Sequence, residues 1–148
     1  MSKREKLVIT LIAICALAIG YRFAGSVNKT NHFVEIIPLT TFAEFEKRSQ
    51  NQKRGQGDIF LTAQQWAWLP ELTISSDRNY ILHIATADIQ HAFHLETGAT
   101  GQSIDVLIQP GQEYLIKLQN LKPGVFAIGC TQYCGIEHNK MRGKLIVE

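Results

Sequence analysis

The sequence lacks several features that mark common classes of protein. Its 148 residues contain no internal repeat and no low-complexity tract, and 45% hydrophobic with 19% charged residues is a globular composition. The net charge is only +2, and residues 57–148 carry six basic against nine acidic side chains. A mildly acidic domain argues against nucleic acid as a partner. The length supports one domain with appendages.

Long apolar runs are also scarce, and only one stretch could cross a membrane. Leu7–Tyr21 contains no charge, follows a basic flank, and extends to Gly25 if Arg22 places its guanidinium at the interface. A bilayer core of about 30 Å needs about 20 helical residues. We therefore expect residues 1–25 to be a single-pass anchor with a cytoplasmic N-terminus and a periplasmic or extracellular C-terminal domain. A cleavable signal peptide is the alternative, because the run is short and rich in alanine.

Residues 26–57 are mixed and mostly polar, and we assign them to a linker. Within it, Thr40 or Thr41 could cap a short helix over Phe42–Arg48. Residues 49–57 are charged, contain two glycines and lack apolar side chains, so they are not expected to bury themselves.

Residues 58–148 show a pattern of short strands separated by turns. Pro110-Gly111 and Lys122-Pro123-Gly124 are turn signals. No amphipathic helix of ten or more residues is expected there. The pattern predicts an all-β Greek-key sandwich or barrel. The expected strands are Asp58–Trp68, Asn79–Ala85, His91–Glu96, Ser103–Ile108, Gln112–Leu118, Gly124–Cys130 and Gly143–Val147.

Candidate metal ligands are concentrated in a short segment near the C-terminus. Cys130, Cys134, His138 and Met141 follow one another at spacings of four, four and three. Thiolate, imidazole and thioether together select copper, because a thioether is a poor ligand for zinc or for hard cations. Copper is therefore the metal that the segment predicts.

Two cysteines are one more than a mononuclear copper site needs. A blue-copper site uses one Cys, two His and a weak axial Met. Two thiolates on one short loop could instead bridge two ions, with His138 and Met141 as terminal ligands. Such a centre still needs a ligand from elsewhere in the chain, and His91 or His94 is the obvious source.

The combined motif resembles the CuA domain of cytochrome c oxidase subunit II. The resemblance rests on Cys-x3-Cys-x3-His-x2-Met with Asp88-Ile-Gln-His91-Ala-Phe93 upstream, and it extends from about Asp58 to Glu148. Trp66-Ala-Trp68 is similar to the aromatic segment of that family. The short, single-span subunit II of B-type oxidases is the most similar form. Five ligand residues at matching spacings make the motif specific.

The resemblance implies a cupredoxin fold and a dinuclear copper centre. Cys130 and Cys134 would bridge the ions, His91 and Met141 would complete one, and His138 with the Gln132 carbonyl would complete the other. Many longer subunits have Glu in place of Gln132, where the side chain also serves an interface magnesium site, so the resemblance leaves that magnesium open here. Trp66 and Trp68 are candidates for electron entry or for core residues.

The function implied is electron entry into a terminal haem-copper oxidase. A c-type cytochrome or small copper protein would donate electrons, and haem in subunit I would accept them. The chain would be part of an enzyme only as a subunit of the oxidase, because no residue is placed for acid or base catalysis. The main alternative is a membrane-tethered protein that holds or delivers copper.

The cysteine pair could also form a disulfide, bind structural zinc or belong to a thioredoxin-like copper chaperone. Met141 has no use in the first two, and the helices of the third are missing. The CuA domain of nitrous oxide reductase is disfavoured because no propeller domain precedes the motif. We expect His94, His83 and His32 to have structural or surface roles.

Overall fold

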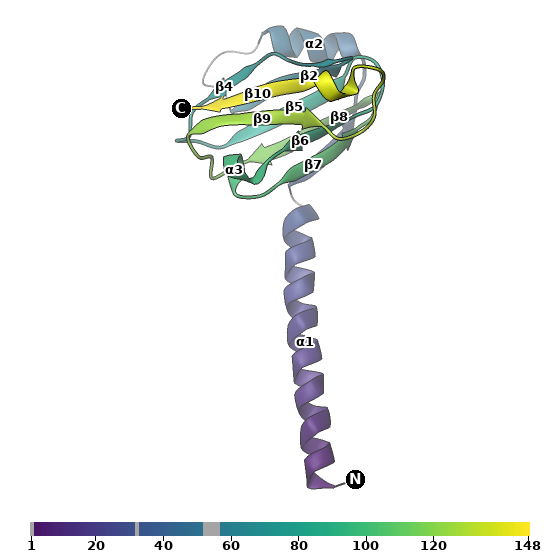
Figure 1. The fold of residues 1–148 in the computed structure, drawn as a ribbon, viewed down its shortest axis with the longest axis vertical. Helices are drawn as coiled ribbons and strands as arrows, with labels where there is room; N and C mark the ends of the chain where they lie inside the picture. Colours follow the sequence, from purple (N-terminus) through teal and green to yellow (C-terminus); the bar gives the residue numbers. More distant parts are fainter. Residues whose placement is uncertain (1, 32, 52–56) are drawn as a thin grey trace. The chain divides into compact units, whose positions relative to one another are not determined.

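The computed structural model describes residues 2–31, 33–51 and 57–148 (Figure 1). They divide near Val34 into two units, which are described separately. The first contains α1 (Lys3–Asn31), and its segment Lys3–Gly25 is long and apolar enough to span a membrane. Apolar side chains such as Leu17 and Ile19 are exposed along it. A bilayer would cover this surface, as the sequence predicted.

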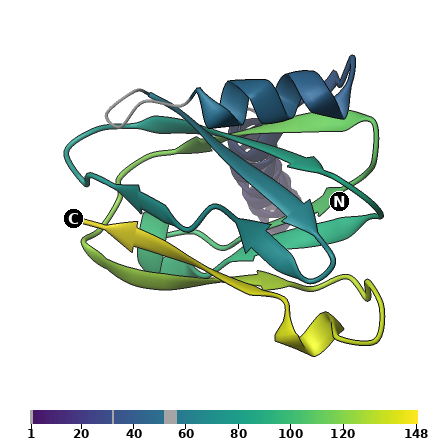
Figure 2. The same cartoon turned by 90° about the horizontal axis from the view of Figure 1, so that it is seen from above.

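The second unit is a sandwich of two five-stranded sheets (Figures 1 and 2). One sheet has the order β1 (Val34–Pro38), β8 (Gln112–Leu118), β5 (Tyr80–Thr86), β2 (Asp58–Gln64) and β3 (Ala67–Leu69). The other has the order β4 (Leu72–Ile74), β10 (Arg142–Val147), β9 (Gly124–Cys130), β6 (His91–Leu95) and β7 (Ile104–Ile108). The short helices are α2 (Phe42–Gln50), α3 (Thr97–Thr100) and the 3-10 turn η1 (His138–Lys140). The predicted all-β, cupredoxin-like fold class is confirmed.

The core between the sheets follows from alternation along the strands. In β6, His91, Phe93 and Leu95 are all at most 1% exposed, whereas His94 lies on the opposite face and is partly exposed. Successive side chains of a strand point to opposite faces, so the first three point into the sandwich. His91 is thus the member of the His91/His94 pair that the fold buries.

Helix α2 covers the outer face of the sheet that contains β2 and β5. Thr41 caps it by accepting a hydrogen bond from the backbone N–H of Glu44, and Phe45 on its inner side is fully buried. The Phe45 ring packs edge-on against Phe60 of β2, with 5.5 Å between centroids. This packing explains why β2 and β5 are buried on both faces.

Two parts of the secondary structure differ from the sequence expectation. The predicted linker contains β1 and α2, and both belong to the second unit. Strand β1 pairs with β8, and Phe45 of α2 packs in a cluster with Phe60 and Ala85. Residues 52–56 of the predicted linker lie outside the described residues. The predicted strand Asp58–Trp68 is instead the hairpin β2–β3, which turns at Gln65-Trp66 without the Gly or Asn that usually signals such a turn. The short strand β4 was not predicted.

Candidate metal centre

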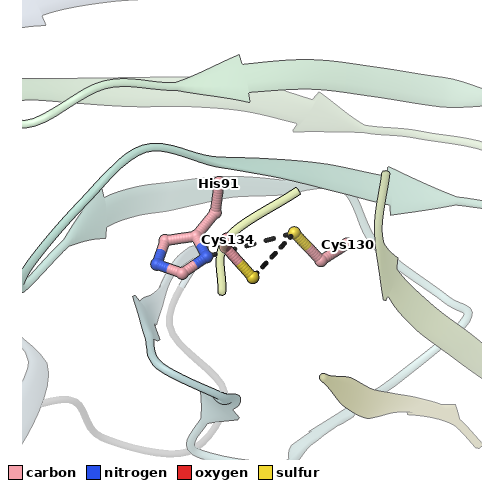
Figure 3. Close-up of side chains that lie close together, drawn as sticks. All are labelled: His91, Cys130 and Cys134. Carbon is pink, nitrogen blue, oxygen red and sulfur yellow. Dashed lines mark hydrogen bonds between the residues drawn. The ribbon is translucent and has the colours of Figure 1, made fainter. Parts of the chain in front are cut away.

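Strand pairing brings the two halves of the candidate site together. Cys130 ends β9, and β9 pairs with β6 so that Cys130 lies opposite Phe93, two residues after His91. Residues 131–141 close the hairpin from β9 to β10 and carry the other candidate ligands. Figure 3 shows the two cysteine sulfurs pointing toward one another beside the ring of His91. The site therefore lies where one loop meets the start of β6.

The two cysteine sulfurs have the spacing of two ligands of the same metal ion. Their Sγ atoms are 3.9 Å apart, and both cysteines are free. A disulfide would bring them to about 2.05 Å. Two sulfurs bound to one ion with bonds of about 2.3 Å, as in thiolate–zinc sites, lie at most about 4.6 Å apart. The geometry thus excludes the disulfide and fits a shared metal.

Nitrogen, oxygen and thioether donors surround the sulfurs. The Nδ1 atom of His91 lies 4.0 Å from the Sγ atom of Cys130, and the carbonyl oxygen of Gln132 lies 3.1 Å from the same sulfur. The Cys134 Sγ atom lies 3.4 Å from Nδ1 of His138 and 3.7 Å from Sδ of Met141. The structure therefore brings together all six residues that the ligand spacing and the resemblance selected.

Asp88 determines which nitrogen of His91 is free to bind a metal ion. The Nε2 atom of His91 lies 2.8 Å from Oδ1 of Asp88. An ionised carboxylate only accepts hydrogen bonds, so Nε2 carries the proton and the lone pair of Nδ1 faces Cys130. Partial burial opposes ionisation, but hydrogen bonds from His91 and from the backbone N–H groups of Gln65 and Ile89 hold the pKa of Asp88 below its usual value. Carboxylates play this role beside metal-binding histidines.

The site is secluded from solvent. His91, Cys134 and Met141 are at most 1% exposed, and Cys130 is 9% exposed. Burial, together with the neighbouring Cys130, raises the pKa of the Cys134 thiol to about 11. Binding a metal would require this thiol to lose its proton, so the centre gains a thiolate only together with a cation that compensates its charge.

The turn between β2 and β3 contributes contacts that the sequence did not reveal. The Gln65 side chain donates a hydrogen bond of 2.7 Å to the carbonyl oxygen of Cys134, and Nε1 of Trp66 lies 3.2 Å from the same oxygen. Trp66 was selected only for its similarity to an aromatic segment. Nothing in the sequence pattern marked Gln65, whereas the position of Asp88 three residues before His91 was a usable signal.

His94, His83 and Trp68 lie away from the sulfurs or behind the ligands. The Nδ1 atom of His94 lies 3.2 Å from Oδ2 of Asp105 on β7. His83 lies under α2, with Nδ1 2.6 Å from Glu113. Trp68 is 3% exposed and packs edge-on against His91, with ring centroids 6.3 Å apart. His32 lies outside the described residues.

The donor set suits a soft metal ion. Two thiolates, two imidazoles, a thioether and one backbone carbonyl favour copper over zinc because of the thioether, and over hard cations because of the sulfurs. Among the described residues, His91, Cys130 and Cys134 each offer a ligand atom, and these three atoms lie within 4.8 Å of one another. The residues present fit copper.

A two-sheet cupredoxin-like domain with this donor set has the features of a copper-binding domain. Comparison with known proteins specifies the class further. The chain is 28% identical over 94 residues to two sequences of cytochrome c oxidase subunit 2 from Thermus thermophilus. The aligned segment covers 63% of this chain and 67% and 54% of the two relatives. The predicted resemblance to the CuA domain of subunit II is confirmed.

Solved structures agree on the fold. One match is a chain from the structure of a haem-copper terminal oxidase dimer, with a TM-score of 0.61 and 21% identity. The match covers 99% of this chain and 100% of that chain. The periplasmic domain of cytochrome oxidase subunit II from Bradyrhizobium japonicum matches 66% of this chain and 86% of its own, with a TM-score of 0.53 and 18% identity. No protein-family model matches the chain.

Proposed function

We propose that this chain is the electron-entry subunit of a terminal haem-copper oxidase. It would accept electrons from a c-type cytochrome or a small copper protein and pass them to haem in subunit I. The similarity to cytochrome c oxidase subunit 2 supports this role. In this assignment the chain belongs to an oxidoreductase complex and carries no oxygen chemistry itself.

The observation that carries the proposal is the cysteine pair with a histidine beside each sulfur. His91 approaches Cys130 and His138 approaches Cys134, while the two sulfurs are 3.9 Å apart. A mononuclear site would leave one thiolate without a function. The arrangement favours a dinuclear centre held by His91, Cys130, the Gln132 carbonyl, Cys134, His138 and Met141. When bound, two coppers would supply a centre that gains and loses one electron.

The protein's own contribution is to hold these ligands still. His91 is fixed by a sheet strand and by Asp88, and Cys130 is fixed by the pairing of β9 with β6. Ligands on a rigid scaffold change position little between oxidation states, which lowers the barrier to electron transfer. Burial also keeps water from the sulfurs. These properties suit electron transfer better than delivery, which requires the metal to leave.

The surface beside the centre could receive an electron donor. Tyr133 and Ile136, both on the ligand loop, are 71% and 87% exposed. Exposed apolar side chains of this kind favour docking with a partner. Trp66 is partly exposed, and its Nε1 atom lies 3.2 Å from the Cys134 carbonyl oxygen, so it is our first candidate for electron entry. Trp68, which is buried against His91, is the second.

Electron paramagnetic resonance of the full chain, purified in detergent and loaded with copper, tests the proposal. We expect two coppers per chain and the hyperfine pattern of one unpaired electron shared by two equivalent nuclei. One copper per chain, or the pattern of a single nucleus, would contradict the dinuclear assignment. The full chain is used, and the residues before Gly57 are kept because β1 and α2 are part of the sandwich.

A further inference from the structure

The turn between β2 and β3 directs two side-chain donors at one backbone oxygen of the ligand loop. The amide nitrogen of Gln65 lies 2.7 Å from the Cys134 carbonyl oxygen, and the indole nitrogen of Trp66 lies 3.2 Å from it. A carbonyl oxygen has two lone pairs, so it accepts both hydrogen bonds. This fixes the peptide plane that follows the buried Cys134.

Glycine at position 135 makes this close approach possible. Gly135 has a φ angle of +118°, a conformation that side chains disfavour. A Cβ atom there would lie 2.9 Å from the Gln65 amide nitrogen and 3.2 Å from the Trp66 indole nitrogen. Glycine is therefore needed both for the backbone angle and for the space that the two donors occupy.

The same turn also contacts the histidine side of the centre. The backbone N–H of Gln65 donates a hydrogen bond of 2.7 Å to Oδ2 of Asp88, whose other oxygen lies 2.8 Å from His91. One residue thus connects Cys134, on the loop after β9, to His91, on β6. Its side chain serves the first connection and its backbone serves the second.

We propose that Gln65 is a positioning residue that holds the Cys134 thiolate in register with His91. The inference rests on the proposed copper function of this site. Gln65 acts through the Cys134 carbonyl and does not ligate the metal. Without its amide, the carbonyl would keep only the longer hydrogen bond from Trp66, and the sulfur would gain freedom to move. Outer partners of this kind commonly change metal affinity about tenfold or more.

The test compares Gln65→Met with the parent chain, since Met has a similar length and no amide to donate. Gln119→Met, at an exposed position immediately after β8, is the matched control. Each full chain is loaded with copper in detergent without any electron donor. We measure the resonance spectrum, the midpoint potential and the rate of copper release to a chelator. We expect Gln65→Met to bind two coppers, to show altered hyperfine splitting and a shifted potential, and to release copper about tenfold faster.

Gly135→Ala provides a second route to the same contact. Its Cβ would displace the donors, so it should alter the spectrum in a similar way, and its effect on copper release should be less than additive with that of Gln65→Met. Parental spectra, potentials and release rates in Gln65→Met would overturn the inference. So would a change that appears only when a donor protein is added. If the parent chain binds one copper, the dinuclear function fails, and the release rates still decide the role of Gln65.

Discussion

The sulfur atoms of Cys130 and Cys134 lie 3.9 Å apart, each beside a different histidine. Because both sulfurs are expected to bridge, Cys130→Ser and Cys134→Ser should each abolish the shared-electron spectrum. Cys15→Ser, on the exposed face of α1, is the matched control and should leave the spectrum unchanged. Electron paramagnetic resonance with copper analysis measures both effects. A serine variant that keeps the parental spectrum would show that its sulfur is not a bridge.

The two neighbouring histidines of β6 should behave differently. His91 is fully buried beside Cys130, whereas His94 pairs with Asp105 on the outer face. His91→Ala should therefore lose the shared-electron spectrum, and His94→Ala should keep it. Copper stoichiometry and the resonance spectrum of both variants provide the check. The reverse result would make His94 the ligand and would contradict the geometry.

Met141→Leu separates electron transfer from copper delivery. Met141 is 1% exposed, with its sulfur 3.7 Å from that of Cys134, and Leu fills a similar volume. An axial thioether tunes the potential of a copper site more than it holds the metal. We expect the variant to keep two coppers and a shared electron with a shifted midpoint potential. Redox titration and copper counting on one sample measure both. Loss of copper without any reversible potential would favour delivery.

Glu113 should make the stability of the sandwich depend on pH. Burial of Glu113 opposes ionisation, but hydrogen bonds from Arg48 of α2 and from His83 hold its pKa below the usual 4.5. A carboxyl whose pKa is lower in the folded chain than in the unfolded chain stabilises the fold at pH values above its unfolded-state pKa. That contribution is lost as the pH falls through its folded-state pKa. Stability should therefore decline below about pH 4.5.

Glu113→Gln should remove this pH dependence. We expect it to lower the free energy of unfolding at neutral pH by roughly 1–3 kcal/mol, because the partners of a buried carboxylate lose charge-assisted hydrogen bonds. Chemical denaturation of the full chain at a series of pH values gives the measurement. Glu71→Gln, at an exposed position, is the control. If the free energy of unfolding changes with pH equally in the parent chain and in Glu113→Gln, the acid sensitivity belongs to other groups.

The basic residues in the first turns of α1, Lys3, Arg4 and Lys6, predict a cytoplasmic N-terminus. A reporter fused after Glu148 should be active outside the cytoplasm, and the chain should remain in membranes after alkaline washing. A reporter fused before Lys3 should be inactive there. Release of a shortened chain that begins near Ser26 would instead identify a cleaved signal peptide.

Local patterns in the sequence were sufficient for much of this protein. Strand alternation and turn residues predicted β8 and β9 with the bounds that the structure has. In both strands the apolar alternation begins where a Pro-Gly turn signal marks the start. The ligand spacing predicted that Cys130, Cys134, His138 and Met141 converge, since three of these side chains lie on one short loop with Cys130 at its start. The choice of His91 over His94 came from the resemblance. Capping chemistry predicted α2 through Thr41.

Only the tertiary structure decided the features that depend on residues far apart in the chain. The division of Asp58–Trp68 into β2 and β3 could not be predicted, because the turn contains no turn-forming residue and its partners lie on distant loops. The inclusion of α2 in the sandwich depends on Phe45 meeting Phe60, and on Arg48 meeting Glu113, 65 residues further along the chain. The link from Gln65 to Cys134 spans 69 residues. Sequence spacing determines which side chains one strand or loop places on the same face. The pairing of strands and the packing of the two sheets determine which distant residues contact those side chains.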